Sequence, residues 1–534
     1  MQQFIEKYGD QISGTLSGFD RLVFRGTPQR LNISYFDASR RIVVAKGMEE
    51  YLWQNHILFK DYGAHVKGVS ERIKQASLKP FREANLPVVF VGDPHQDKDL
   101  PARQLAAERG IRSGLVCAIS TLEPSPTFDY VKSRIARRTR PSHVLYHYQI
   151  HPEVGWMYAR LQTWFPFHMQ IGLNGREWLS RQMDQEGLKY HQAGNCFPWM
   201  EDYRRAQELL NRQLETNWAD VLGGFAHSLN PLHQEIFANY PTEPYWTCYQ
   251  SEWATDIVFR EAAFLQRLMS VLMPHAMLSF GSADVLRFFG KRLNKSGAIP
   301  ANFHGELQTN FRQHEEGERV KYWMDGNSVK SYDKAYSEQG NVLRAAETTI
   351  NNVSVFQSYR PKQGGPKEDL QWRPMRKGIA DVYRRAEISQ KTNERLVNAM
   401  ASVDDSRRLE ELTASLQQPT SWKGRRVRAL RPWAEDQELL AAIHHGDFLI
   451  NGFRNRDLQA LLYTTPAPSL KEQRRRSAAI SRKLRMLRAH GIIHKISHTH
   501  RYHVAQGART ILVAILTAAR TSLNQINQLQ ERAA

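Results

Sequence analysis

His147 and Gln149 form the residue pair whose types and spacing best suit metal chemistry in this chain. They flank Tyr148 in an aromatic segment that we expect to form a strand. Residues two apart on a strand face the same side, so an imidazole nitrogen and an amide oxygen can hold one divalent ion. A tyrosine beside that ion can attack a phosphodiester, and Tyr190 and Tyr203 are candidates. The alternative is that these side chains line a half-exposed sheet.

The segment 147–149 resembles the metal site of relaxases and rolling-circle initiators, which use a His-hydrophobe-His or His-hydrophobe-Gln pair. A second segment resembles the K-x-Y-x-K pattern, followed by Leu-Arg and Glu, of some plasmid and phage replication initiators. Its residues are Lys330, Tyr332, Lys334, Leu343, Arg344 and Glu347. Strand alternation puts the first three on one face, where they suit phosphate contact and base stacking. We expect Arg344 to pair with an acid on a neighbouring strand; an ordinary hairpin with cross-strand ion pairs is the alternative.

Scattered carboxylates form a third candidate site. Metal-dependent nucleases gather two to four carboxylates around Mg²⁺ or Mn²⁺, and no other cofactor is expected here. The acids considered are Asp20, Asp256, Asp333 and Glu347. The candidate catalytic residues are therefore His147, Gln149, Tyr332 and Glu347, and the candidate metal ligands are Asp20, Asp333 and Glu347. Pairing of these acids with arginines or with solvent is the alternative.

Several other functional classes are excluded by missing patterns. No GxxxxGK[ST] loop and no GxGxxG motif before a helix occurs, so nucleotide-driven motor activity is not expected. The three cysteines lie far apart and form no CxxC pair, which excludes a zinc ribbon; the spacing also argues against a disulfide framework and fits a reducing cytoplasm. No apolar run approaches the length of a membrane span, so we expect a cytoplasmic protein without a membrane partner.

The charge of the chain points to a polyanionic partner. The 534 residues carry a formal net charge of +19. Residues 421–503 hold 17 Lys and Arg and 6 Asp and Glu, a net charge of +11 in about a sixth of the chain. Nucleic acid is the commonest partner of such a segment, and a solvated surface is the alternative.

The carboxyl-terminal segment has the pattern of a winged helix-turn-helix. We expect a first helix over 434–443 and a short second helix over 456–463, with Asn455 as its N-cap. Ser469 is the expected N-cap of a long third helix, and Gly491 is its expected left-handed C-cap. A strand from Ile492 to Ile496, a polar turn and a return strand from Arg501 to Val504 follow.

The third helix has an apolar stripe and basic faces. Ile480, Leu484 and Leu487 recur at helical spacing and are expected to pack on a core. Arginine side chains on the other faces suit phosphate oxygens and guanine edges of a major groove. The predicted nucleic-acid contacts are Lys471, Arg474, Arg475, Arg476, Ser477, Arg482, Lys483 and Arg485 on the helix, and His498, His500 and Arg501 on the wing. A winged helix used for protein contacts is the alternative.

The segment 434–520 resembles the winged-helix domains of bacterial MarR-type regulators. The whole chain resembles an uncharacterised bacterial protein family that shares four motifs. These are FDRLVFRG (19–26), QTWFPFHMQIGLNGREW (162–178), QSEWATD (250–256) and LRAHGIIHK (487–495). The first resemblance implies DNA binding, and the second does not indicate which activity the chain has.

The rest of the chain indicates a mixed α/β architecture. Strands are expected over 12–16 and 19–24 around a Ser17-Gly18 turn, and a strand-helix-strand unit over 86–120 suggests some parallel pairing. Residues 200–290 look mostly helical, with Asp202 as a helix cap. Asp325-Gly326 is a hairpin turn signal, and 361–374 and 422–432 look like connectors.

We therefore predict a mixed α/β multidomain protein with a helical middle and a C-terminal winged helix-turn-helix domain. The expected domains are 1–300 (mixed α/β and helical), 301–360 (strand-rich, packed on the first), 361–433 (linker and helices) and 434–534 (winged helix). The expected function is DNA binding, as a transcriptional regulator or a mobile-element protein. A homodimer is one expected assembly, and RNA is an open alternative partner. The rival function is a metal-dependent nicking enzyme, replication initiator or nuclease.

Overall fold

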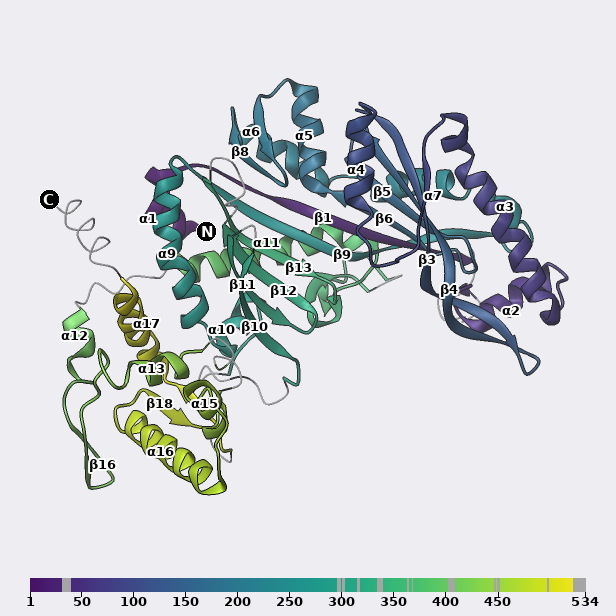
Figure 1. Cartoon of the computed structure of the whole chain (residues 1–534). Helices are drawn as coiled ribbons and strands as arrows, with labels where there is room; N and C mark the ends of the chain where they lie inside the picture. Colours follow the sequence, from purple (N-terminus) through teal and green to yellow (C-terminus); the bar gives the residue numbers. More distant parts are fainter. Residues whose placement is uncertain are drawn as a thin grey trace. The chain divides into compact units, whose positions relative to one another are not determined.

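The computed structural model describes residues 1–30, 40–294, 299, 303–314, 317–333, 340–362, 365–366, 368–401, 409–445, 448, 452–496 and 499–521. The predicted mixed α/β class is confirmed, with a large mixed sheet and many helices (Figure 1). The chain forms two compact units, each assembled from distant segments. Unit 1 comprises Met1–Thr15, Thr255–Thr348 and Gln390–Ala534, and unit 2 comprises Leu16–Ala254 and Thr349–Ser389.

Six neighbouring strands of unit 2 lie in the order β1-β6-β5-β4-β3-β2. Their bounds are β1 (Ile12–Arg30, whose first four residues belong to unit 1), β2 (Val88–Val91), β3 (Gly114–Val131), β4 (Arg134–His151), β5 (Gly155–Gln162) and β6 (Met169–Asn174). The pair β2–β3 is parallel and the others are antiparallel. Helix α4 (Asp99–Glu108) connects the parallel pair, which confirms the predicted strand-helix-strand unit.

Helices cover this sheet and bury its apolar side chains. They are α2 (Ala45–Gln54), α3 (Tyr62–Glu83), α5 (Gly175–Glu186), α6 (Tyr203–Asn211), α7 (Trp218–Leu229) and α8 (His233–Ile236). In α3, Val66, Ile73 and Phe81 are buried at helical spacing, and the helix packs against β3. Asn174 caps α5 by accepting from the backbone N–H groups of Arg176 and Glu177.

The predicted turn at Ser17-Gly18 is wrong, because β1 runs through it without interruption. Gly18 has a packing role instead. A Cβ at this position would lie 2.4 Å from the side chain of Leu210, so the missing side chain lets α6 approach the strand. Asp202 caps α6 as predicted, since its carboxylate accepts from the N–H of Arg205 at 2.9 Å.

The expected helical middle is interrupted by a long strand, β9 (Thr242–Phe259). Its sequence TEPYWTCYQSEWATDIVF is rich in β-branched and aromatic residues, and its first half alternates between buried and accessible positions. Two small hairpins also belong to unit 2. They pair β7 (Tyr190–Ala193) with β8 (Cys196–Met200) and β14 (Gln357–Arg360) with β15 (Gln371–Pro374). The expected connector 361–374 therefore ends in a strand.

Four neighbouring strands of unit 1 lie in the order β10-β11-β12-β13. The bounds of its elements before residue 420 are β10 (Leu307–His314), β11 (Gly317–Met324), β12 (Asn327–Asp333), β13 (Val342–Ile350, entering unit 2), α1 (Gln2–Tyr8), α9 (Ala262–Ser279), α10 (Ser282–Phe288), α11 (Val382–Ala401, which begins in unit 2) and α12 (Leu409–Ala414). The predicted turn is confirmed: Asp325 and Gly326 have φ values of +48° and +79° and join β11 to β12.

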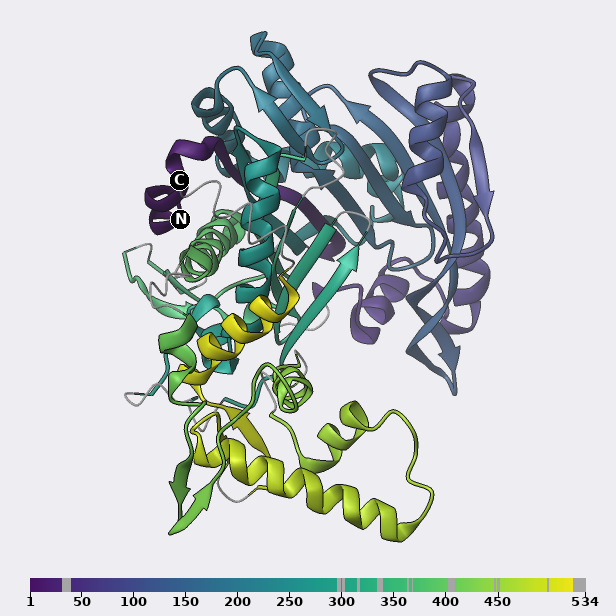
Figure 2. The same ribbon diagram turned by 60° about the vertical axis from the view of Figure 1, so that its left-hand side comes forward.

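The carboxyl-terminal part of unit 1 contains the predicted helices and two short hairpins (Figure 2). Its elements are β16 (Thr420–Trp422), β17 (Arg425–Val427), α13 (Gln437–Ile443), α15 (Asn455–Leu462), α16 (Leu470–Ala489), β18 (Ile493–Lys495), β19 (Tyr502–Val504) and α17 (Gln506–Arg520). Ser469 caps α16 and Gly491 has φ of +70°, both as predicted. The cap of α15 is Arg454 rather than Asn455, and the expected connector at 422–432 contains the β16–β17 hairpin.

One apolar cluster holds these elements together. Ile480, Leu484 and Leu487 of α16 are buried in it, which confirms the predicted stripe. Leu439 of α13 and Leu458 of α15 are also buried there. Asn455 uses its side-chain amide to join α15 to α16, donating to the carbonyl of Ser477 and to the hydroxyl of Ser481, each at 2.9 Å.

Gly175→Ala should destabilise unit 2, because a Cβ there would lie 1.8 Å from the carbonyl oxygen of Phe19. Backbone cannot yield as a side chain can, so we expect a loss of about 1–3 kcal/mol or more in the free energy of unfolding. Gly223→Ala in α7 is the matched control. Nothing lies within 4 Å of its Cβ position, and the substitution should add up to about 1 kcal/mol through helix propensity. Chemical denaturation of both variants measures the difference; equal stabilities would contradict the close approach at Gly175.

Candidate nucleic-acid interface and the other predicted sites

His147 lies on β4, but its side chain is in the core. Its Nε2 is 3.1 Å from the hydroxyl of Ser77 on α3, and its ring packs edge-on against Phe81. Burial lowers the pKa of His147 to about 4, so the ring is neutral at pH 7. The amide of Gln149 donates to the sulfur of Met157 at 3.4 Å. In the part of the chain that the structure describes, neither residue belongs to a group of three acids, histidines or cysteines spaced for a metal.

The segment that resembles replication initiators forms a buried ion network in unit 1. The guanidinium of Arg344 binds both carboxylate oxygens of Asp256 on β9, at 2.8 and 3.1 Å, which confirms its predicted pairing across strands. The third guanidinium nitrogen of Arg344, Nη1, donates to Glu347 at 2.8 Å. Arg344 is 0% exposed and Glu347 is 1% exposed, so neither can meet a nucleic acid in this state.

Lys330 and Tyr332 share a face of β12, as strand alternation predicts, and both address Glu347. The ammonium of Lys330 lies 2.8 Å from one carboxylate oxygen, and the Tyr332 hydroxyl donates to the other at 3.1 Å. These contacts compensate a buried carboxylate, which is costly without partners. Lys334 lies outside the described residues. The predicted phosphate-contacting face at this strand is therefore not supported.

Asp20 and Glu347, two of the acids proposed as metal ligands, have protein partners within their own units. In unit 2, Asp20 accepts from the side-chain amide of Asn195 at 2.6 Å, and Arg176 Nε lies 3.4 Å from its other oxygen. A carboxylate oxygen of Glu252 lies within 4.8 Å of one of Asp20. In unit 1, burial and the nearby charge of Glu318 raise the pKa of Asp333 to about 6. Asp333 belongs to no metal-spaced group among the described residues.

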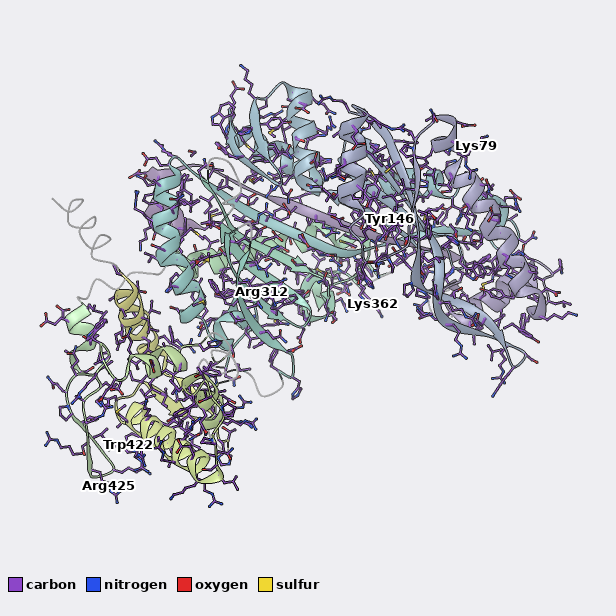
Figure 3. The ribbon with its side chains drawn as sticks, in the orientation of Figure 1. Lys79, Tyr146, Arg312, Lys362, Trp422 and Arg425 are labelled. Carbon is purple, nitrogen blue, oxygen red and sulfur yellow. The ribbon has the colours of Figure 1, made fainter. Side chains whose placement is uncertain are left out.

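The aromatic segment 146–167 contains polar side chains that bind a shared carboxylate, that of Glu123. Tyr146, labelled in Figure 3, donates to Glu123 at 2.7 Å, and Arg160 forms two hydrogen bonds to the same carboxylate. Burial raises the pKa of Tyr146.

A groove of about 560 Å³ lies on the outer side of α3. Its lining includes Glu71, Arg72, Gln75, Lys79, Arg82 and Leu232.

The exposed face of α16 carries a stripe of cations. Lys471, Arg474, Arg482 and Arg485 are all exposed. The three arginines follow Lys471 by 3, 11 and 14 residues, which keeps all four on one side of a helix with 3.6 residues per turn. The buried stripe of Ile480, Leu484 and Leu487 lies on the opposite side, so packing of that stripe fixes the direction of the cations.

Four of the predicted α16 contacts make interactions within the protein. Glu472 accepts two hydrogen bonds from Arg475, at 2.7 and 2.9 Å, and one from Arg476 at 3.2 Å. Arg476 is partly buried, donates to the carbonyl of Thr465 and lies over the ring of Tyr463. The hydroxyl of Ser477 donates to the side-chain oxygen of Asn455 at 3.4 Å, and Lys483 is partly buried. Burial opposes the shift, but hydrogen bonds from Arg428 and from the backbone of Arg431 lower the pKa of Asp436, with a smaller contribution from the charge of Lys483.

The predicted wing is a short antiparallel hairpin of β18 and β19. His500 is exposed near its tip, and Arg501 is partly buried, donating to the carbonyl of Gly452 at 3.2 Å. His498 lies outside the described residues. An isolated bridge between Phe453 and Tyr502 adds a third extended segment beside β19.

Sequence reasoning missed the β16–β17 hairpin, which lies beside α16 (Figures 2 and 3). Lys423 and Gly424 form its turn with φ values of +49° and +74°. The signal was present in the sequence, because Lys-Gly flanked by Ser-Trp and Arg-Arg-Val fits a two-residue hairpin turn. We predicted a connector here instead, because a run of arginines is also typical of a basic connector.

Comparison of the chain with family models, curated proteins and solved structures finds no match. The site must therefore be interpreted from its own geometry. Cys117, Cys196 and Cys248 are buried and none is in a disulfide. Within the described residues, the helices are too short or too polar to cross a lipid bilayer.

His147 should make the stability of unit 2 sensitive to acid. Burial lowers its pKa from 6.5 to about 4, so the unfolded state takes up a proton before the folded state does. Its contribution is therefore complete above about pH 6.5 and is lost as the pH falls towards 4, at about 1.4 kcal/mol per pH unit. Denaturation midpoints at pH 7, 6 and 5 should fall more steeply for the unmodified protein than for His147→Gln. Parallel curves would show that the ring is not buried in its neutral form.

Proposed function

We propose that residues 434–520 form a winged-helix module that binds duplex DNA, with α16 in the major groove. The observation that carries this proposal is the stripe of exposed cations on α16 directly opposite its buried apolar stripe. A helix that enters a groove needs one side fixed to its domain and the other side able to reach bases and phosphates. Guanidinium groups suit both guanine edges and phosphate oxygens.

The arrangement of the surrounding elements supports this assignment. Helices α13, α15 and α16 precede the β18–β19 hairpin, and the bridge between Phe453 and Tyr502 supplies a third extended segment, as a winged helix requires. Asn455 links α15 to α16 through two hydrogen bonds, which fixes the angle of the helix-turn-helix pair. The hairpin and its exposed His500 follow directly from the C-terminus of α16.

The geometry favours DNA over double-stranded RNA as the partner. The major groove of B-form DNA admits an α-helix, whereas the major groove of A-form RNA is deep and narrow. An exposed helix face with four cations therefore suits B-form DNA. Such a module fits the role of a transcriptional regulator and equally that of a mobile-element protein.

The rival enzyme has less support. His147 occupies a core position against Ser77 and Phe81, and the Tyr332 hydroxyl is engaged by the buried Glu347. A nucleophile or metal ligand must reach its substrate in a productive geometry. Incubation of the protein with supercoiled DNA and Mg²⁺ or Mn²⁺ tests this rival directly, and nicking would support it.

The triple variant Arg474→Ala, Arg482→Ala and Arg485→Ala should weaken binding to a random-sequence DNA duplex by at least about tenfold. Removing each phosphate contact should also flatten the dependence of log affinity on log salt by about 0.9. Fluorescence anisotropy over a range of salt concentrations measures both quantities. Lys60→Ala, Lys67→Ala and Arg109→Ala, exposed cations of unit 2, form a control of equal charge change. Equal losses of affinity in the two triple variants, or no loss in either, would overturn the proposal.

A further inference from the structure

We propose that the β16–β17 hairpin is a second DNA-contacting arm, which grips the phosphate backbone next to the groove that α16 enters. The inference rests on the proposed function, because it needs α16 to bring a duplex to this side of unit 1. The β16–β17 hairpin precedes α13, α15 and α16 in the sequence, whereas the wing of β18 and β19 follows them. The hairpin therefore adds a contact surface that is separate from the wing.

The turn of the hairpin stabilises its two strands at the tip, where they are exposed. Thr420 pairs with Val427 and Trp422 with Arg425 across a two-residue turn. Lys423 and Gly424 both have positive φ, the backbone geometry whose twist matches that of two antiparallel strands. Such a turn keeps the two strands in register even at an exposed tip.

The tip is basic and carries no compensating acid. Residues 420–428 contain four Lys and Arg and no Asp or Glu. Lys423, Arg425 and Arg426 are exposed, and Arg425 is labelled on the hairpin in Figure 3. Across the residues that the structure describes, these three side chains form no ion pair. Three unneutralised cations on one small hairpin attract an anionic partner.

The base of the hairpin is fixed, in contrast to its tip. Arg428 donates to both carboxylate oxygens of Asp436, at 2.7 and 2.8 Å. The carbonyl oxygen of Arg428 lies 2.8 Å from Nε2 of His490, which follows the last residue of α16. Val427 packs on the apolar cluster of this part of the chain. The arm is therefore held to the same small core that orients the helix.

A cation–π contact couples the arm directly to α16. The guanidinium carbon of Arg488 lies 5.3 Å from the centre of the Trp422 ring. Trp422 is partly buried beside the helix and Arg425 lies opposite it in the pair register, at the start of the return strand. Movement of the hairpin relative to the C-terminal half of α16 would break this contact.

Phosphate is the group that these side chains suit best. The tip offers three exposed cationic side chains, Lys423, Arg425 and Arg426, and phosphate oxygens accept hydrogen bonds from such groups at every nucleotide. Contacts of this kind strengthen binding to every sequence equally and depend strongly on salt. An acidic protein surface is the other partner that charge alone would allow, and the experiment separates the two.

The test uses the full chain with Lys423→Ala, Arg425→Ala and Arg426→Ala together. Affinity for a random-sequence duplex should fall at least several-fold, and the salt slope should decrease by up to about 2.7, or 0.9 for each contact. Arg425→Lys with Arg426→Lys should retain most of the affinity, because lysine keeps the positive charge that releases counterions from the phosphates. The control is Lys132→Ala, Arg134→Ala and Arg137→Ala, which removes equal charge from exposed positions at and beside the two-residue turn of the β3–β4 hairpin.

A crosslinking measurement locates the arm on DNA. Lys423→Cys can carry a photoreactive maleimide, since the three native cysteines are buried. Crosslinks to the duplex from this position, and none from Ser133→Cys in the turn of the β3–β4 hairpin, would support the proposal.

The outcomes separate this inference from the proposed function. Unchanged affinity and no crosslink, together with loss of binding in the α16 triple variant, would overturn the arm and leave the winged helix standing. Equal losses of affinity in the hairpin and control variants would also overturn it, because only net charge would then matter. Retained DNA binding in the α16 variant would overturn the proposed function itself.

Discussion

Burial of one apolar stripe of α16 is the constraint on which the rest of the carboxyl-terminal part depends. Ile480, Leu484 and Leu487 can leave water only if the helix presents that side to α13 and α15. The rotation of the helix about its axis is thereby fixed, and so is the direction of every other side chain on it. Hydrophobic burial on the other side of the helix holds Arg474, Arg482 and Arg485 outward, and among the described residues no hydrogen bond or ion pair directs them.

A second constraint, the burial of charge, explains why the most chemically suggestive residues of unit 1 lie among charged partners. Arg344 is surrounded by Asp256 and Glu347 at 0% exposure, and Lys330 completes the set. An isolated buried ion would be very unfavourable, so each charge requires its partners in place. A cluster of acids, bases and tyrosine in a sequence therefore fits a rigid network in a sheet as well as it fits a reaction centre.

The sequence predicts local structure well where a physical signal has one reading. Ser469, Gly491 and the turn at Asp325-Gly326 follow from capping and turn chemistry, and the stripe of α16 follows from periodicity. Prediction failed where a residue serves a distant neighbour. Gly18 was predicted to lie in a turn, but it allows the side chain of Leu210 to approach the strand. His147 was predicted to bind a metal, but its ring lies against Ser77 of α3. The inward direction of Arg476 likewise depends on Tyr463, which only the fold brings near.

The carboxylate of Glu472 competes with bound anions for the guanidinium groups of Arg475 and Arg476. Its carboxylate already occupies the guanidinium of Arg475 with two hydrogen bonds and also engages Arg476. A phosphate that binds Arg475 must displace Glu472, so it gains only the difference in free energy between the arginine–phosphate and the arginine–carboxylate pair. It also lies close to the negative charge of the displaced Glu472. The same pairing keeps the long side chain ordered before an encounter, which reduces the entropy lost on association. One acid in the first turn can thus lower the attraction for unrelated polyanions while the helix stays ready for a well-fitted one.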